Sequence, residues 1–484
     1  MTSTPPWPEV VLPHGGRLRG AWAADGVRVF RGVPYAQAPF GALRFAAPVP
    51  VPPWSGVRDA CDFAPMAPQL ARHARPDALP LGGEDCLAVN VWAPACEPGS
   101  RLPVMVWVHG GGFFRGAASD PLYDGTSFAR QGVVWVSLQY RLGVDGFVQL
   151  DGAPANRGLL DQLAALQWVQ QSIAAWGGDP ARVTVCGQSA GAGALACLLG
   201  MPASRGLFSQ AILQSPSVAC QTMDEAAAAR DAVAQLAGVA PTRAGLQQAP
   251  LKALLHAVHR LAAEPALRAQ HGLGGRNFFP LRPVVDGQVL QAPPLQAMRT
   301  VWMEHPALLR VLVGSNADEM HLYHVPGGAI DRVTDAQVQA FAQDVGLPLQ
   351  ALQTYRAHWP AEREPSPGEL LSALQSDYYY RVPAMRIASL ASDAAMATYR
   401  YSFEWASPQW RGRLGAAHAV ELPFVLGNLT SAQGLEFTGP SPRRICATPC
   451  TVRGCSSHAR VHRAGRRTCL TIPQPRYSTR PVAV

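Results

Sequence analysis

The 484-residue sequence lacks the features that mark several classes of protein. Residues 1–20 contain no basic segment followed by an apolar one, so no secretory signal peptide is predicted and a cytoplasmic location is expected. No internal repeat is visible, which excludes solenoids and propellers. Only 15% of the residues are charged and 48% are hydrophobic, so the chain can bury a large core and is not intrinsically disordered.

Cysteine pairs with the spacing of metal ligands are also absent. None of the ten cysteines forms a Cys-x-x-Cys pair or matches a zinc-ligand spacing, so we expect no metal site. We expect no cofactor either. An unbroken apolar run of membrane-spanning length is missing too. Residues 183–204 are uncharged and long enough, but glycines, Gln188 and Pro202 interrupt them. We interpret this segment as a strand, a turn and a buried helix, and expect no membrane span.

Acidic residues and lysine are missing from the end of the chain. From Arg443 onward there are nine arginines and no Asp, Glu or Lys. A formal net charge of +8 would by itself suggest a nucleic-acid partner, but these nine arginines account for all of the excess positive charge. The residues before Arg443 carry 32 basic and 33 acidic side chains. The body of the protein is therefore neutral, and its charge predicts no nucleic-acid partner.

The rest of the chain is organised around residues 182–199. The β-branched residues of 183–186 favour a short buried strand, and the small apolar residues of 190–199 favour a helix. Between them the sequence GQSAG matches Gly-x-Ser-x-Gly, with Ser189 at its centre. This is the pattern of a nucleophile elbow, in which a strained strand-to-helix turn exposes one hydroxyl. An isolated match also fits a glycine-rich turn with a solvated serine, so the surrounding elements decide.

The surrounding pattern alternates strands and helices. Apolar runs rich in β-branched residues predict buried strands at 87–92, 103–109 and 132–140, and an apolar stripe predicts a helix over 156–176 that ends in a turn at 177–180. Further predicted elements are a hairpin at 18–35, strands at 211–214, 309–313 and 398–405, helices at 335–345 and 384–392, and a helical insertion at 224–296. This order favours an α/β fold, with a mostly parallel central sheet, helices on both faces and an insertion that forms a lid or pocket walls.

A second glycine motif follows one of the predicted strands. Three glycines, Gly110, Gly111 and Gly112, come directly after His109. Because they have no side chains, their backbone N–H groups can approach a ligand closely and converge on one oxygen. An ordinary flexible loop would also accommodate three glycines. An α/β-hydrolase, however, needs a loop of this kind after an early strand to complete its oxyanion hole.

With these two motifs the sequence resembles the type-B carboxylesterase family, which includes bacterial para-nitrobenzyl esterases and the cholinesterases. The similarity extends over about residues 16–430 and includes FRGVPYA at 30–36, GEDCL at 83–87, NRGLLDQ at 156–162, GDP at 178–180, GSNADE at 314–319 and HAVELPF at 418–424. The resemblance implies an α/β-hydrolase fold in which Ser189 is the nucleophile, Glu319 the acid and His418 the base of a catalytic triad. It also implies that the N–H groups of Gly111, Gly112 and Ala190 form the oxyanion hole.

The residues alone leave two of these assignments open. His418 is one of six histidines after Glu319, and Asp318 is an adjacent alternative to Glu319. A serine hydroxyl is a poor nucleophile until a neutral imidazole accepts its proton, and a buried carboxylate holds that imidazole in the required tautomer. This chemistry requires one histidine and one carboxylate, and only the family pattern ranks the candidates.

The sequence departs from the family pattern near these motifs. Gln188 stands where the family often has Glu, which removes a negative charge beside the nucleophile and disfavours choline esters as substrates. Met66 stands where many relatives have Cys, so Cys86 lacks its usual disulfide partner unless Cys61 replaces it. A missing disulfide agrees with a reducing compartment.

We therefore expect a serine carboxylesterase that cleaves small-molecule esters through an acyl-enzyme intermediate. Amide or carbamate hydrolysis by the same triad is one alternative. A non-catalytic cholinesterase-like binding protein is the other, although such proteins characteristically lose triad residues, and all three are present here. The sequence predicts no particular oligomeric state.

The chain is predicted to form a single α/β-hydrolase domain over residues 1–440, followed by an atypical tail at 441–484. The tail contains nine arginines, four cysteines and no tryptophan, whereas relatives end in an apolar helix that contains a Trp. GC-rich codons read out of frame tend to yield arginine, proline, cysteine and serine, so we hypothesise that the tail is frameshifted or disordered. A genuine basic tail that binds an acidic surface is the alternative.

Overall fold

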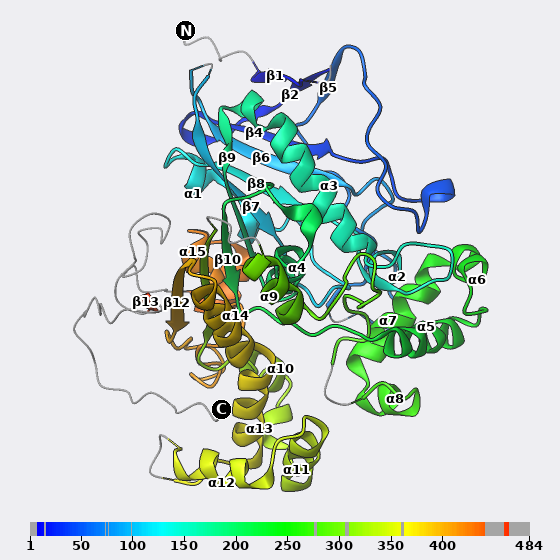
Figure 1. Ribbon diagram of the computed structural model, residues 1–484, viewed down its shortest axis with the longest axis vertical. Helices are drawn as coiled ribbons and strands as arrows, with labels where there is room; N and C mark the ends of the chain where they lie inside the picture. Colours follow the sequence, from blue (N-terminus) through cyan, green and yellow to red (C-terminus); the bar gives the residue numbers. More distant parts are fainter. Residues whose placement is uncertain are drawn as a thin grey trace.

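A ten-stranded sheet with helices on both faces forms the centre of the molecule (Figure 1). The computed structural model describes residues 7–13, 16–72, 74–75, 77–97, 99–274, 278–304, 309–359, 363–440 and 459–463. The strands of the large sheet are β3 (Ala21–Trp22), β4 (Val27–Pro34), β6 (Ala88–Pro94), β7 (Leu102–Val108), β8 (Val134–Leu138), β9 (Gly178–Gln188), β10 (Gln210–Gln214), β11 (Arg310–Asn316), β12 (Ala397–Phe403) and β13 (Ala459–Arg463). A small separate sheet contains β1 (Glu9–Val11), β2 (Arg17–Arg19) and β5 (Val57–Asp59).

The central strands of the large sheet are parallel. Its order is β13-β12-β11-β10-β9-β7-β8-β6-β4-β3, and the strands from β12 to β8 all run in the same direction. The antiparallel strands β6, β4 and β3 extend one edge, and a 3-10 turn at Ala24–Gly26 closes the predicted hairpin. β-branched side chains meet at the centre, where Val106 of β7 pairs with Val136 of β8 and Val185 of β9. The predicted α/β-hydrolase sheet is confirmed.

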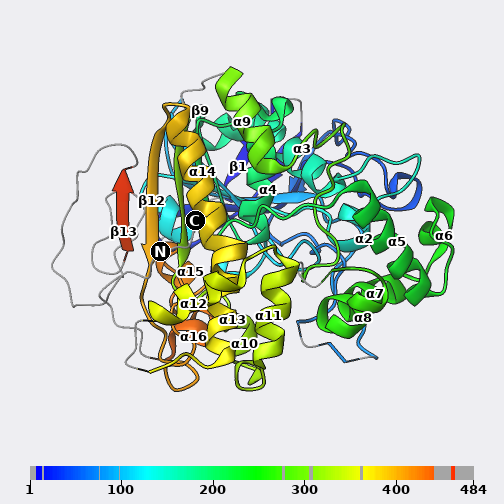
Figure 2. The same cartoon turned by 60° about the horizontal axis from the view of Figure 1, so that its bottom comes forward.

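The described helices either cover the two faces of the sheet in two layers or stand outside these layers. They are α1 (Thr126–Ala129), α2 (Gly143–Phe147), α3 (Arg157–Ser172), α4 (Ala190–Leu199), α5 (Met223–Ala237), α6 (Arg243–Gln248), α7 (Leu251–Ala263), α8 (Pro265–Gln270), α9 (Pro294–Glu304), α10 (His321–His324), α11 (Asp335–Asp344), α12 (Leu349–Ala357), α13 (Pro367–Ser376), α14 (Val382–Asp393), α15 (Leu422–Val425) and α16 (Ala432–Thr438). One core contains side chains from α3, α4, α9 and α14, and the other contains side chains from α1, α15 and α16. Strand β7 contributes to both cores because its side chains alternate: Val106 belongs to the first and Trp107 to the second. In Figure 2, α14 lies along β12 and β11.

Two helical groups stand outside these layers. The predicted insertion at 224–296 forms α5 to α8 and leads into α9, and α5 to α8 lie together beyond one end of the sheet (Figure 1). A second group, α10 to α13, follows β11. A π-helical turn at Asp377–Arg381 joins it to α14, which leads into β12. No helix of the described ranges is long and apolar enough to cross a membrane.

The tail is only partly described. Within it, Ala459–Arg463 form β13, which pairs antiparallel with β12. Residues 441–458 and 464–484 lie outside the described residues, and so do most of the arginines and all four cysteines of the tail. The domain boundary at 440 and the frameshift hypothesis therefore stay predictions.

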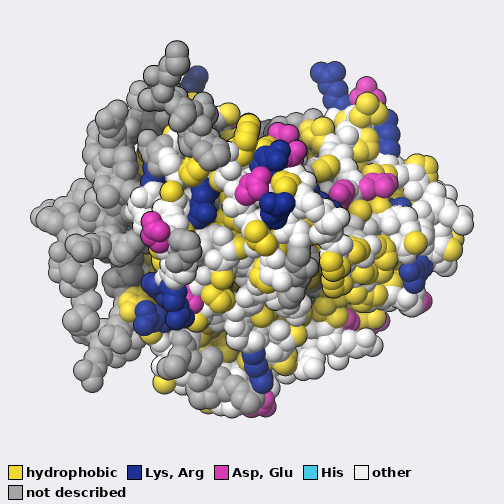
Figure 3. Space-filling model, turned by 90° about the horizontal axis from the view of Figure 1, so that it is seen from above, with side chains coloured by type: hydrophobic (Ala, Val, Ile, Leu, Met, Phe, Trp, Pro, Cys, Tyr) yellow, Lys and Arg dark blue, Asp and Glu magenta, His cyan; other side chains and the backbone are white. Residues whose placement is uncertain are grey.

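The surface and the cysteines of the body fit the sequence-based expectations. On the face shown in Figure 3, basic and acidic side chains are interspersed among apolar and neutral ones, in keeping with the balanced charge before Arg443.

The six cysteines of the described body are all free, including Cys61 and Cys86. Cys61 therefore does not replace the missing disulfide partner of Cys86.

Candidate active site

Ser189 occupies the strained turn between β9 and α4. Its backbone has φ 57° and ψ −126°, a conformation that residues with a side chain rarely adopt. The turn is this sharp because α4 crosses close to β7: a Cβ atom at Gly191 would lie 2.1 Å from the carbonyl oxygen of Val108. Only glycine fits there. The strand, turn and helix predicted from residues 182–199 are thus present, with Ser189 at the N-terminus of α4.

The three-glycine motif lies directly against this serine. A Cβ atom at Gly110 would be 3.1 Å from the Cβ of Ser189, so the two turns are in contact. Gly111 and Gly112 both have positive φ, of 116° and 66°, and a Cβ at Gly111 would lie 2.1 Å from the carbonyl oxygen of Arg115. The turn that contains Gly111 and Gly112 therefore begins against Ser189, which Ala190 follows as the first residue of α4.

Glu319 and His418 form a buried pair. The imidazole Nδ1 of His418 lies 2.6 Å from Oε2 of Glu319, and the two side chains are 3% and 0% exposed. The backbone also joins them, because the N–H of His418 donates to the carbonyl oxygen of Glu319 at 3.1 Å. Asp318, the alternative acid, instead accepts the N–H of Ala416 at 3.0 Å. Of the histidines that the sequence left open, His418 is the one that contacts Glu319 among those whose side chains the structure describes, which leaves out His458 and His462.

Two further residues hold the other oxygen of Glu319. Oε1 accepts the hydroxyl of Ser215 at 2.6 Å and the backbone N–H of Asn316 at 2.7 Å. Sequence reasoning missed both residues. Asn316 lies within the GSNADE motif and Ser215 follows β10 directly, so their positions at the ends of neighbouring strands were the available signals.

A second carboxyl group lies beside this pair and was also missed. The Asn316 amide donates to Oε2 of Glu421 at 2.5 Å. Burial raises the pKa of Glu421 to about 7, and the negative charge of Glu319 contributes to the increase. Glu421 therefore takes up a proton near neutral pH, whereas the Glu319 carboxylate receives two hydrogen bonds and contacts His418.

The Glu421 proton predicts how stability depends on pH. Because the folded protein binds this proton more tightly than the unfolded chain, in which the carboxyl pKa is near 4.5, Glu421 contributes fully below about pH 4.5. The contribution, roughly 3 kcal/mol at most, is lost as pH rises to about 7. We expect Glu421→Gln, which imitates the protonated form, to flatten the fall in melting temperature between about pH 5 and pH 7.5. The exposed Glu436→Gln is the control, and an equal slope in all three proteins would contradict the assignment.

The second imidazole nitrogen contacts a glutamine. His418 Nε2 lies 3.1 Å from Nε2 of Gln188, the residue before the nucleophile. No hydrogen bond joins the Ser189 hydroxyl to His418 within the described structure. Catalytic hydrogen bonds are often long before substrate binds, so this arrangement does not argue against a role for Ser189.

Aromatic side chains surround the imidazole. The ring of Tyr380 lies 4.5 Å from that of His418, and the ring of Tyr323 lies 5.8 Å from it. Phe279, from the insertion, covers the glycine turn: a Cβ atom at Gly112 would be 2.6 Å from its ring. The insertion thus reaches the site, as a pocket wall is expected to do.

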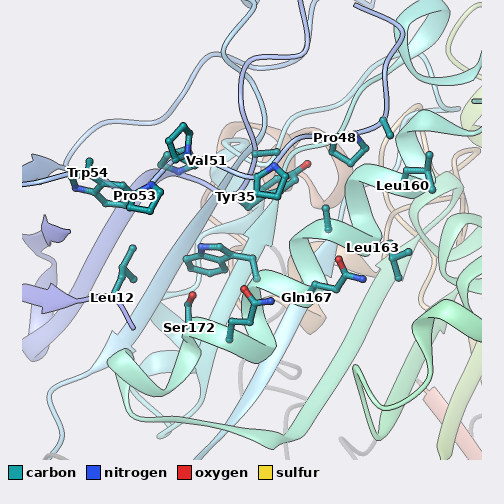
Figure 4. Close-up of a pocket in the computed structure, with 18 residues that line it drawn as sticks. Leu12, Tyr35, Pro48, Val51, Pro53, Trp54, Leu160, Leu163, Gln167 and Ser172 are labelled. Carbon is teal, nitrogen blue, oxygen red and sulfur yellow. The ribbon is translucent and has the colours of Figure 1, made fainter. Parts of the chain in front are cut away.

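Another cavity lies away from this site. It has a volume of about 420 Å³ and lies between α3 and the proline-rich segment 47–54 (Figure 4). Trp54, Leu163 and Gln167 are among its lining residues, and none of the predicted site residues lines it. This cavity is distinct from the site around Ser189.

The comparison with known proteins agrees with this geometry. The model of the carboxylesterase family matches residues 8–441. The chain belongs to the carboxylesterase family. It is 37% identical over 443 residues to the para-nitrobenzyl esterase of Bacillus subtilis (strain 168), covering 88% of this chain and 84% of that protein. It is 35% identical to the phenmedipham hydrolase of Pseudarthrobacter oxydans, covering 86% of this chain and 83% of that protein.

Solved structures of carboxylesterases share the fold. A carboxylesterase of Geobacillus stearothermophilus superposes with a TM-score of 0.77 at 34% identity, covering 90% of this chain and 88% of that one. A para-nitrobenzyl esterase structure gives a TM-score of 0.71 at 34% identity, covering 88% and 86%. This carboxylesterase therefore hydrolyses carboxylic esters and acts on small molecules, and the binding-protein alternative is not favoured.

Proposed function

We propose that Ser189 is the nucleophile of this carboxylesterase, His418 the general base and Glu319 the acid that orients the base. The observation that carries the proposal is the 2.6 Å contact between His418 and Glu319 at the elbow that holds Ser189. A second contact supports the proposal. Gln188, the residue before Ser189, is hydrogen-bonded to His418 Nε2, the imidazole nitrogen that does not face Glu319.

The proposed reaction proceeds in two steps. Ser189 Oγ attacks the carbonyl carbon of the ester while His418 Nε2 accepts its proton, and Glu319 stabilises the imidazolium that forms. The negative charge on the carbonyl oxygen is stabilised by the N–H groups of Gly111, Gly112 and Ala190. The intermediate then expels the alcohol, which takes the proton from His418 and leaves an acyl-serine. A water molecule, activated by His418 in the same way, releases the acid and regenerates Ser189.

The remaining parts of the proposal concern substrate and location. The substrate is a small-molecule carboxylic ester, and the charge balance before Arg443 supports the absence of a nucleic-acid partner. A cytoplasmic location is supported by the free thiols of Cys61 and Cys86.

Covalent labelling tests the assignment of the nucleophile. An organophosphate such as diisopropyl fluorophosphate should modify Ser189, because the fluoride is displaced by the activated hydroxyl and the adduct cannot deacylate through the ester pathway. Mass spectrometry of the digested protein should find the adduct on the peptide that contains Ser189. We expect His418→Ala to slow labelling by about 10³-fold or more, since the hydroxyl then has no base.

A matched histidine controls for a general effect of the substitution. His358 is exposed at the end of α12, and His358→Ala should label at the wild-type rate. An adduct on another serine, or equal labelling of the two histidine variants, would refute the proposed triad.

A further inference from the structure

Arg115 is a half-buried cation beside the glycine turn of the active site. It follows Gly110 to Phe114 in the chain, and its guanidinium carbon lies 5.2 Å from the centre of the Phe114 ring. A Cβ atom at Gly111 would be 3.2 Å from Arg115 Cγ, so the side chain starts against the backbone that we assign to the oxyanion hole. The backbone and the first side-chain carbons of Arg115 are therefore held against the glycine turn.

The guanidinium of Arg115 makes no hydrogen bond or ion pair within the described ranges, which sets it apart from the other arginines of the interior. Arg44 pairs with Asp145 at 2.8 Å, and Arg141 pairs with Asp161 at 2.7 Å. Burial lowers the pKa of Arg115, and the nearby positive charge of Arg72 lowers it further. Buried or half-buried charges are normally paired, so an unpaired guanidinium beside a reaction site has unused capacity for an anion.

A second arginine, Arg72, is three residues from a side chain that is hydrogen-bonded to the same turn. The Gln69 side chain makes two hydrogen bonds to the backbone of Gly116, one donated to the carbonyl oxygen and one accepted from the N–H, both at 2.8 Å. These bonds join the segment that carries Arg72 to the turn that carries Arg115. Arg72 itself is exposed. Of the two cations, Arg115 is therefore half-buried and Arg72 is in contact with solvent.

Both cations act electrostatically on a tyrosine next to the imidazole. Burial raises the pKa of the Tyr323 phenol, and the charges of Arg115 and Arg72 act against that increase. The Tyr323 ring in turn lies 5.8 Å from His418. The carboxylates of this region, Glu319 and Glu421, are fully buried at the far side of His418, and the position beside Ser189 is the neutral Gln188. Among the described residues, Arg115 is thus an unpaired cation at the glycine turn, and Glu319 and Glu421 do not pair with it.

We propose that this carboxylesterase prefers esters that carry a carboxylate or similar anionic group close to the scissile bond, which Arg115 binds and Arg72 attracts. The inference rests on the proposed function, because it assumes that the ester reacts at Ser189. The guanidinium offers several N–H donors in a planar fork, which matches the geometry of a carboxylate. The exposed Arg72 acts over a longer range and increases the local concentration of anions at the entrance.

Two pairs of matched esters test the preference. In the first pair the charge is on the acyl part: the 4-nitrophenyl esters of 4-carboxybenzoic acid and of its neutral carboxamide. In the second pair it is on the alcohol part: 4-acetoxybenzoate and 4-acetoxybenzamide. For at least one pair, kcat/KM of the wild-type protein should be about 10 to 100 times higher for the anionic ester, the usual value of a hydrogen bond to a charged group. The pair that shows the preference tells which part of the substrate faces Arg115.

Substitutions assign the preference to its residues. Arg115→Met should bring the ratio of the two kcat/KM values to within about threefold of one, and Arg115→Lys should retain only part of it, because the charge remains but the planar fork is lost. Arg72→Gln should lower the ratio by less, and its effect should disappear at high salt. Arg299 is an exposed arginine on α9, and Arg299→Met controls for the loss of one positive charge.

The possible outcomes separate the two proposals. If Ser189→Ala hydrolyses these esters as the wild type does, the proposed function fails. If Ser189→Ala is inactive but neither pair shows a preference, or Arg115→Met and Arg299→Met give the wild-type ratio, only the inference about anionic substrates is wrong.

Discussion

Replacing Ser189 by alanine should lower kcat/KM for a short-chain para-nitrophenyl ester by at least about 10⁴-fold. No other hydroxyl is placed at the elbow to attack the substrate, and the oxyanion hole alone gives only a small residual rate. The substitution should not change the fold, because alanine meets the same backbone strain as serine at φ 57°. Release of nitrophenol and the melting temperature are the two measurements.

A serine at the other end of the neighbouring strand serves as the control. Ser209 precedes β10 and makes only weak contacts, of 3.4 Å, to backbone carbonyl oxygens. Ser209→Ala should retain wild-type activity. If Ser189→Ala and the wild type release nitrophenol at equal rates, the catalytic assignment is wrong. The same assay with amide and carbamate analogues measures how strongly the site prefers esters.

Glu319→Gln should reduce kcat by about 10⁴-fold while leaving the protein folded. The structure determines how the new amide is oriented. Its oxygen takes the place of Oε1, where the Ser215 hydroxyl and the Asn316 N–H both donate, so its NH₂ group faces His418 Nδ1. The imidazole must then accept at Nδ1 and carry its proton on Nε2. In that tautomer His418 cannot accept the proton of Ser189.

The neighbouring carboxylate provides a matched control for this variant. Asp318→Asn alters the residue that holds Ala416 and leaves the contact with His418 in place. It should reduce kcat far less than Glu319→Gln does. An equal loss in the two variants would show that the loop, and not the tautomer, is the cause.

The strands and helices that hold the site could be predicted from local patterns. The apolar runs near β7, β8 and β9 and the stripe of α3 are short-range signals, and the structure has these elements close to the expected bounds. The turn expected at 177–180 was only partly right. Gly178 pairs with Leu102 and starts β9, and the Asp179 carboxylate is fixed there by Arg101 at 3.1 Å. That stabilisation comes from a distant segment, so local sequence could not show it.

The contacts within the site were less accessible to sequence reasoning. His418 lies 99 residues from Glu319, and Ser215 lies 104 residues from it. No periodicity links such positions, so only the family resemblance singled out His418, and nothing singled out Ser215. Likewise Glu421 was visible as part of a motif, but its protonation depends on burial next to Glu319, which is a property of the folded chain.

The contact between Gln188 and His418 implies that the Gln188 amide reorients when His418 gains or loses a proton. When the imidazole is neutral, the Gln188 NH₂ group can donate to Nε2 across the observed 3.1 Å. Once His418 has taken the proton of Ser189, Nε2 is itself a donor, and the same amide end repels it. A half-turn about the last side-chain bond would present the amide oxygen instead. Glutamate could accept from the charged imidazole but could not donate to the neutral one. A reversible rotation of the amide, in step with the acylation cycle, is therefore open to Gln188 and closed to the carboxylate of a Gln188→Glu variant.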